Sequence, residues 1–322
     1  MFRSKLVAAR DRLKDPRSFI SSSGLFIFFA GLFIYFSIAS PHFLNTRNFI
    51  NVFTAVSVIG IVATAMTLAI IGRGPDLTVG AVVAMMGSVQ ANLVLINGFP
   101  WYVGILAGIG IGLCVGFLNG LIIVKFNLSP FIVTLGMMNV VRGLCFVLTG
   151  GLAYFINVPG LVYLGRARWA GIPVSIIVLI ASFVIFDFIS NKTVFGRQIY
   201  ASGANRTATR LAGINVNKIG ISLYVLSGFM ASVAGMIVVG IGGAALPNMG
   251  ESYPLDAITA VLLGGTSLAG GSGSVRRTFL GILIIGIMNN GMALMNVQTF
   301  WQISAKGALL LAAIILDGLR NK

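Results

Sequence analysis

Long apolar stretches alternate with short polar segments along the whole chain. Most of them approach the roughly 20 residues that an α-helix needs to cross a bilayer, and none shows the alternation of a barrel strand. The pattern predicts a bundle of about ten transmembrane helices. We expect interruptions or re-entrant backbone at the third stretch, which follows the letters GRGPD, and at the short eighth. The stretches cover residues 23–40, 49–71, 77–96, 101–124, 128–149, 172–189, 219–243, 255–269, 279–295 and 302–318.

The composition supports an all-α integral membrane protein with one domain over residues 1–322. Of the 322 residues 57% are hydrophobic and only 9% are charged, and the mean hydropathy is +0.99, far from the composition of a soluble domain. The net charge of +15 resides mainly in short loops, so it indicates topology and no nucleic-acid partner. Cys114 and Cys145 lie in apolar stretches, and we interpret both as core residues without a disulfide or metal.

Basic residues are distributed unequally between the two sides of this topology. If the N-terminus is cytoplasmic, 17 of the 22 Lys and Arg residues lie on the inner side, and only Arg47, Arg166 and Arg168 lie in outer loops. Positively charged loops stay in the cytoplasm. We therefore predict that both termini, the N-terminal arm 1–22 and the loop 190–218 are cytoplasmic, and that the first helix is an anchor.

The two halves of the chain show a weak similarity. A division near residue 165 leaves five helices on each side, and an odd number requires that a repeat be inverted in the membrane. GPDLTVGAVVAMMG and YPLDAITAVLLGG each place one Asp before a glycine-containing apolar stretch. We predict two inverted five-helix halves; the alternative is that glycine only permits close helix packing.

The chain shows no energy source of its own. None of its seven acidic residues falls at the centre of a predicted span, which disfavours a carrier coupled to ions. GGTSLAGGSGSVRR lacks the Gly-Lys-Ser/Thr ending of a phosphate-binding loop, so we expect a turn there. The energy for transport must then come from a partner.

Residues 196–220, GRQIYASGANRTATRLAGINVNKIG, resemble a piece of a soluble protein. Asn205 predicts an N-cap for a helix over 206–212, with Arg206 and Arg210 on one face, the apolar Leu211, and Gly213 as a left-handed stop. The helix could dock on another protein. The alternative is that both arginines are ordinary cytoplasmic charges in contact with anionic membrane lipid.

From about residue 40 onward the chain resembles the membrane-spanning permease subunit of ATP-binding-cassette sugar importers, which include ribose, xylose, arabinose and galactoside permeases. The matching stretches occur in family order: GPDLTVGAVVAM, FIVTLGMMNVVRGL, FGRQIYASGANRTATRLAGINVNKI, SGFMASVAGMI, LDAITAVLLGGTSLAGGSGSV and NNGMALMNV. One departure is GRGPDLTVG, where sugar permeases usually read closer to SGGIDLSVG; Arg73 and Pro75 are the differences, and we take them to concern the choice of sugar.

The resemblance implies a non-enzymatic transport subunit in the bacterial inner membrane. Its partners would be a second permease copy in a homodimer, a cytoplasmic ATPase and a periplasmic sugar-binding protein. GANRTATRLAGINV would be the coupling helix that fits a cleft on the ATPase. The expected cargo is a pentose or hexose. Alternatives are the same machine carrying a branched-chain amino acid, a nucleoside or a sugar-like signal molecule, and, in another class, a stand-alone ion-coupled carrier.

Polar side chains within the apolar stretches are the candidates for the substrate path. Amides in membrane helices also bond to neighbouring helices. The two basic side chains are costlier to bury, so we expect them to face the path or to be paired, unless they reach the membrane surface. No catalytic, metal or cofactor site is predicted. The candidates are Asn119, Asn139, Arg142, Asn289, Asn290 and Lys306.

Overall fold

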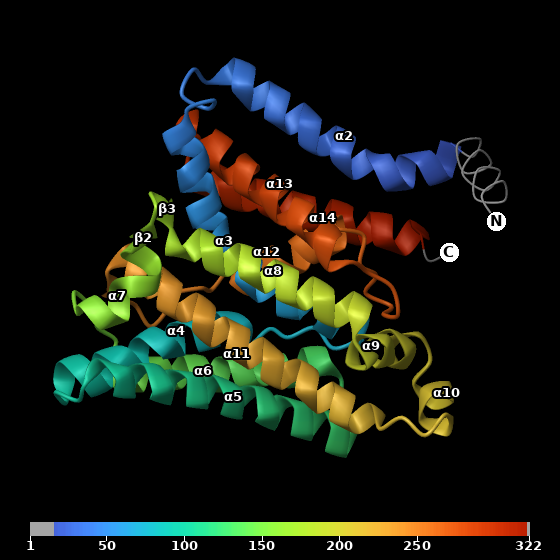
Figure 1. Cartoon of the computed structure of the whole chain (residues 1–322), viewed down its shortest axis with the longest axis horizontal. Helices are drawn as coiled ribbons and strands as arrows, with labels where there is room; N and C mark the ends of the chain where they lie inside the picture. The colour runs from blue at the N-terminus through green and yellow to red at the C-terminus, as the bar shows by residue number, and fades with distance from the viewer. Residues whose placement is uncertain (1–15, 321–322) are drawn as a thin grey trace.

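The computed structural model describes residues 16–320, and all ten predicted apolar stretches form helices there (Figure 1). Most of the basic N-terminal arm 1–22, and Lys322, lie outside the described residues. Among the described helices, eight are long and apolar enough to cross a membrane, and two offer shorter apolar stretches, Gly24–Ala39 and Tyr253–Leu263. The ten are α2 (Pro16–Ala39), α3 (Thr46–Ile71), α4 (Val79–Gln90) with the π-helix η1 (Ala91–Ile96), α5 (Trp101–Phe126), α6 (Pro130–Thr149), α8 (Val174–Lys192), α11 (Val216–Gly242), α12 (Tyr253–Leu263), α13 (Val275–Leu294) and α14 (Thr299–Arg320).

Shorter elements occupy the two ends of the bundle. α7 (Pro159–Arg166) and the hairpin of β2 (Arg168–Trp169) and β3 (Ile172–Pro173) lie at the end opposite α9 (Val194–Ala204) and α10 (Arg206–Leu211) (Figure 1). β1 (Tyr154–Phe155) pairs antiparallel with β4 (Ala244–Ala245). This pairing joins the segment after α6 to the segment after α11, one from each half of the chain.

α3 and α11 form the centre of the bundle and pack against each other. α3 also contacts α12 and α13, and α11 contacts α4 and α5 in the same way; α4 packs on α6 as α12 packs on α14. Exchanging the halves therefore reproduces most of the packing, as the predicted repeat requires. The first helices of the halves deviate, since α2 packs on α13 and α8 packs on α3.

Irregular backbone precedes both short helices, α4 and α12. Their starts meet inside the bundle, where a Cβ on Gly80 would collide with the carbonyl oxygen of Gly250. At the far end of α12 the N–H of Gly271 donates to the carbonyl oxygen of Ile71 at 2.8 Å. α12 thus runs toward the end of α3 while α4 runs away from it, so the two are inverted. The third stretch is continuous over Val79–Ile96, with irregular backbone before it and not within it, whereas the eighth is short, as the sequence predicts.

Small residues bring α5 and α11 into close contact. A Cβ on Gly116 would collide with the carbonyl oxygen of Tyr224, and one on Gly228 with that of Gly112. Such close approach is how small residues stabilise helix pairs in membranes. Cys114 lies away from this contact and is exposed, so its prediction as a core residue was wrong, whereas Cys145 is buried as predicted.

We expect Gly116→Val to destabilise the protein by about 1–3 kcal/mol, the usual cost of overpacking. The added methyl groups must displace the backbone of α11. The measurement is the thermal unfolding of the detergent-solubilised protein. Gly110→Val is the matched control, because it carries the same change in helix propensity and its Cβ meets nothing within 4 Å. Equal losses in the two variants would contradict a steric role for Gly116.

Candidate coupling and translocation sites

The polar segment between α8 and α11 folds into α9 and α10. α9 begins after Thr193, whose hydroxyl accepts a hydrogen bond from the N–H of Gly196 at 3.0 Å. α10 begins after Asn205, whose side-chain oxygen accepts from the N–H of Ala208 at 2.9 Å. The N-cap predicted at Asn205 is therefore present, and α10 ends one residue earlier than predicted.

α10 presents basic and apolar side chains to the exterior. Arg206 and Arg210 are exposed, and Leu211 is 84% exposed. Arg206 donates to the side-chain oxygen of Asn217 at 3.4 Å, which leaves most of its guanidinium open. Gly213 follows with a φ of 81°, the left-handed conformation expected for the stop. Two guanidinium groups and a leucine thus project together from one end of the bundle.

α9 is hydrogen-bonded to two loops of the bundle. Nη2 of Arg73, in the segment after α3, donates to the carbonyl oxygen of Ala204 at 3.0 Å. The hydroxyl of Tyr200 donates to the carbonyl oxygen of Gly273, before α13, at 3.1 Å. Burial raises the pKa of Tyr200, so this hydroxyl remains protonated as a donor. α9 therefore links α10 to both halves of the chain.

The irregular segment 72–78 contains a buried carboxylate. Oδ1 of Asp76 accepts hydrogen bonds from the N–H of Thr78, at 2.9 Å, and from its hydroxyl. Nδ2 of Asn119 on α5 donates to the same hydroxyl oxygen at 3.1 Å. All three side chains are buried. Asn119, a candidate for the substrate path, thus joins α5 to the start of α4.

Arg142 of α6 holds the second irregular segment, 243–252. Its Nη1 donates to the carbonyl oxygens of Pro247 and Met249, each at 2.8 Å. These carbonyls have left the helical pattern and need donors inside the bundle. The guanidinium therefore supplies hydrogen bonds to irregular backbone.

Lys306 of α14 is paired, one of the two roles expected for it. Its Nζ lies 3.0 Å from Oδ2 of Asp256, which also accepts from the hydroxyl of Ser252 at 3.1 Å. Asp256 lies in the first turn of α12, where the helix dipole favours a negative charge. The chain between Met249 and Asp256 is therefore held by α6 on one side and by α14 on the other.

Asn289 and Asn290 border a cavity of about 360 Å³ between α3, α13 and α14, together with Asn51 and Gln302. Asn290 exchanges two hydrogen bonds with Asn48, at 2.8 and 2.9 Å, and so joins α13 to α3. The side-chain oxygen of Asn289 has no hydrogen-bond partner among the described residues. Of these two candidates, only Asn289 keeps a free polar atom at the cavity.

The six candidates do not converge on one cavity. Asn119 and Asn290 bond to other helices, Arg142 and Lys306 hold segment 243–256, and Asn139 is exposed on α6. The sequence did not predict which residues these candidates bond to. No local pattern points to Asn48 or Asp256, because these pairings span 242 and 50 residues.

We expect Lys306→Met to destabilise the protein by about 1–3 kcal/mol. It leaves the carboxylate of Asp256, which is 6% exposed, without a counter-ion. The expected loss is below the roughly 3–5 kcal/mol of a fully buried pair, because Lys306 is 25% exposed. The double variant Lys306→Met with Asp256→Asn should recover most of the stability, as measured by thermal unfolding. No recovery in the double variant would show that the ion pair itself is unimportant.

Comparisons with known proteins agree on one family. Residues 48–316 match the family model described as the permease component of branched-chain amino acid transport systems. The ribose import permease protein of Bacillus subtilis is 41% identical over 283 residues, which cover 87% of this chain and 88% of the relative. The L-arabinose transport system permease protein of Escherichia coli is 36% identical over 286 residues, covering 89% and 87%. No solved structure matches the chain. The chain therefore belongs to this family of multi-pass membrane permease components.

Proposed function

We propose that this chain is the membrane-spanning subunit of an ATP-driven, binding-protein-dependent importer of a monosaccharide, a pentose or hexose, in the bacterial inner membrane. One observation carries the proposal: the chain is 36–41% identical to permeases named for arabinose and ribose, over nearly nine-tenths of each chain. The family model, which matches residues 48–316, covers nearly all of α3 and the whole of α4 to α13.

A branched-chain amino acid is the runner-up cargo, because the family description names it. An amino acid carries two charges at neutral pH, and a dry path must pair both. Arg142 and Lys306, the basic residues within the helices, are already engaged by carbonyl groups and by Asp256. Asn139, exposed on α6, and the unpartnered side-chain oxygen of Asn289 add uncharged amide groups. Amides suit the neutral hydroxyls of a sugar.

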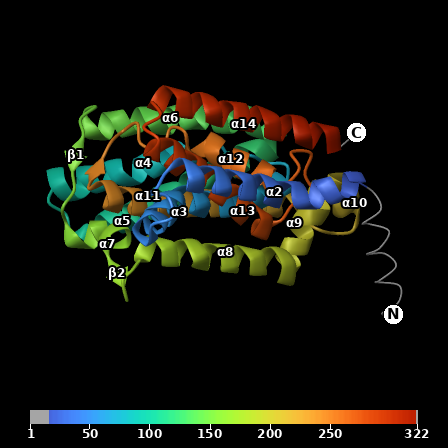
Figure 2. The ribbon, with the colours of Figure 1, turned by 90° about the horizontal axis from the view of Figure 1, so that it is seen from above.

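The path is proposed to run along the face between α6 and α14. Figure 2 shows both helices on the side of the bundle opposite α8. α6 exposes Gly136, Asn139 and Gly143, with nothing near a Cβ at either glycine. Glu251, between the points held by Arg142 and Lys306, is also exposed. Polar groups facing lipid would be costly, so this face suits a second copy that encloses the path.

α10 is the proposed contact with a cytoplasmic ATPase. It exposes Arg206, Arg210 and Leu211, and it is connected through α9 to the segments before α4 and α13. Movement of the ATPase would thus reach both halves of the bundle. The distribution of basic residues supports a cytoplasmic position for α10 and both termini, and the opposite end, with α7 and the β2–β3 hairpin, would receive the sugar-binding protein.

Uptake into proteoliposomes tests the cargo and the energy source together. The chain is reconstituted with its ATPase and binding protein, and radiolabelled ribose, arabinose and leucine are offered with and without ATP. We expect ATP-dependent uptake of a pentose and none of leucine. Accumulation of leucine would contradict the sugar assignment, and uptake driven by a proton gradient without the ATPase would contradict the importer.

Exchanging both Arg206 and Arg210 for Lys should separate docking from lipid contact. Lys keeps the charge but not the planar fork, so attraction to lipid would persist. Docking should weaken about tenfold or more, because each lost charge-assisted hydrogen bond costs about 1.5–3 kcal/mol. The measurement is the amount of ATPase that co-purifies. Arg197→Lys, at an exposed position on α9, is the control.

Gly213→Val should also lower the amount of ATPase that co-purifies, through the backbone strain of its positive φ alone. Normal ATPase recovery in both variants would leave α10 as an ordinary basic loop.

A further inference from the structure

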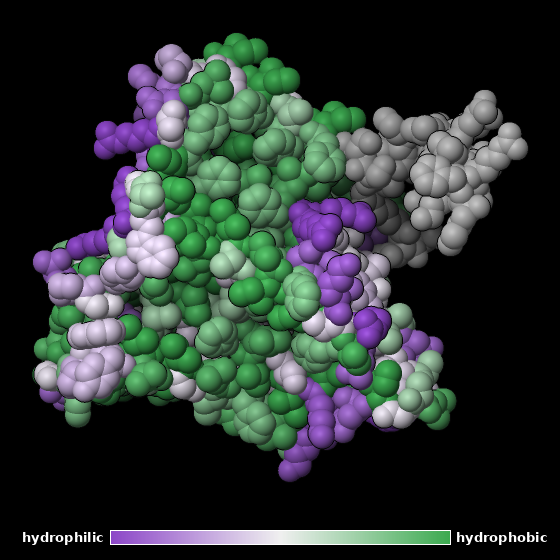
Figure 3. All heavy atoms as spheres, viewed as in Figure 1, coloured by the Kyte–Doolittle hydropathy of each residue, from purple (hydrophilic) through white to green (hydrophobic). Residues whose placement is uncertain are grey.

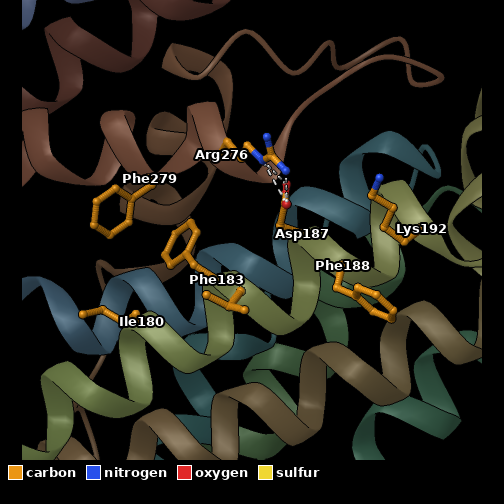
Figure 4. Close-up of a pocket in the computed structure, with 8 residues that line it drawn as sticks. Ile180, Phe183, Asp187, Phe188, Lys192, Arg276 and Phe279 are labelled. Carbon is orange, nitrogen blue, oxygen red and sulfur yellow. Dashed lines mark hydrogen bonds and ion pairs between the residues drawn. The ribbon is translucent and has the colours of Figure 1, made fainter.

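A groove on the surface of α8 and α13 combines an apolar channel with a basic end (Figure 4). Its volume is about 490 Å³, within the range of small-molecule sites. The rings of Phe183 and Phe279 meet edge to face at 4.9 Å and form its floor. Ile180 and Val184 line it and are 50% and 63% exposed. Because α8 and α13 are candidate membrane spans, this apolar part faces lipid chains.

The polar groups of the groove gather at one end. Asp187, Lys192 and Arg276 line this end, where α8 leads into α9. Figure 3 shows the same transition, from a hydrophobic surface over α8 to hydrophilic residues at the end of the bundle near α9. The adjoining Arg277 is also exposed. Three basic groups and one acidic group leave this end with a net positive charge.

Asp187 orients Arg276. Nε of Arg276 donates to both carboxylate oxygens of Asp187 at 2.9 Å, and Nη2 lies 2.8 Å from Oδ2. Nη1 of Arg276 and Nζ of Lys192 have no hydrogen-bond partner among the described residues, and the Arg276 side chain is 74% exposed. A held guanidinium with a free edge, at the same end of the groove as a free ammonium, is suited to a phosphate group.

We propose that this groove binds an anionic phospholipid. Its phosphate lies between Arg276 and Lys192, and one acyl chain follows the channel over Phe183 and Val184. The net positive end favours an anionic headgroup over a zwitterionic one, and a location at the end that carries α9 and α10 faces the leaflet richer in anionic lipid if that end is cytoplasmic. The N-terminal arm, with six basic residues among residues 1–22, has the wrong charge to fill it.

Native mass spectrometry of the full chain in detergent tests this site, with phosphatidylglycerol as the probe and phosphatidylcholine as the comparison. We expect phosphatidylglycerol to bind about fivefold or more tightly than phosphatidylcholine. Lys192→Gln should weaken its binding about fivefold, the contribution of one basic residue near a lipid headgroup. Lys125→Gln, an exposed lysine at the end of α5, is the control and should have no effect.

Val184→Trp probes the apolar part without a change in charge. The indole should occupy the channel and lower phosphatidylglycerol binding, while thermal unfolding reports that both variants remain folded. Equal binding of the two lipids, or equal binding by Lys192→Gln and Lys125→Gln, would overturn the site. So would a cross-link from Val184→Cys to residues 1–15, because it would show that the chain itself fills the groove.

Discussion

Irregular backbone within a membrane bundle must find its hydrogen bonds in the protein, and this requirement organises the molecule. Segments 72–78 and 243–252 both enter the bundle, and their ends meet where Gly80 faces Gly250. Each unpaired backbone group would cost several kcal/mol in hydrocarbon. The half-buried guanidinium of Arg142 lies within the bundle for this reason, since it satisfies two carbonyls of the second segment. Placing a guanidinium within a membrane bundle costs free energy, but leaving these backbone carbonyls without donors would cost more.

Hydrogen bonds to irregular backbone also connect α10 mechanically to the rest of the bundle. α9 bonds through Ala204 to the segment before α4 and through Tyr200 to the segment before α13, while α6 and α14 hold the chain before and at the start of α12. A displacement of α10 would therefore reach the short helices first and the face between α6 and α14 second. α3, whose residues from Val56 to Ile71 are all buried, and α4, which is buried throughout, form the packed core of the bundle.

The helices and their approximate ends could be predicted because hydrophobic length is a local property. The cap at Asn205 and the stop at Gly213 are equally local, and both are present. Pairings between distant elements could not be predicted. Asn290 was a candidate for the path, but its amide meets Asn48 across 242 residues, and no sequence pattern distinguishes an amide that bonds another helix from one that faces a cavity. The prediction that Cys114 is a core residue was wrong for a similar reason, because the sequence of an apolar helix does not show which side faces lipid.

The position of Arg73 in the fold bears on how its departure from the sugar-permease pattern is interpreted. Its departure from the usual sugar-permease pattern suggested a change in the choice of sugar. Its side chain donates to the carbonyl oxygen of Ala204, at the end of α9 next to α10. Its φ of 65° is uncommon for a residue other than glycine. Backbone strain at a charged residue persists only where its contacts compensate, so we infer that Arg73 adjusts how tightly α9 is fastened to the bundle.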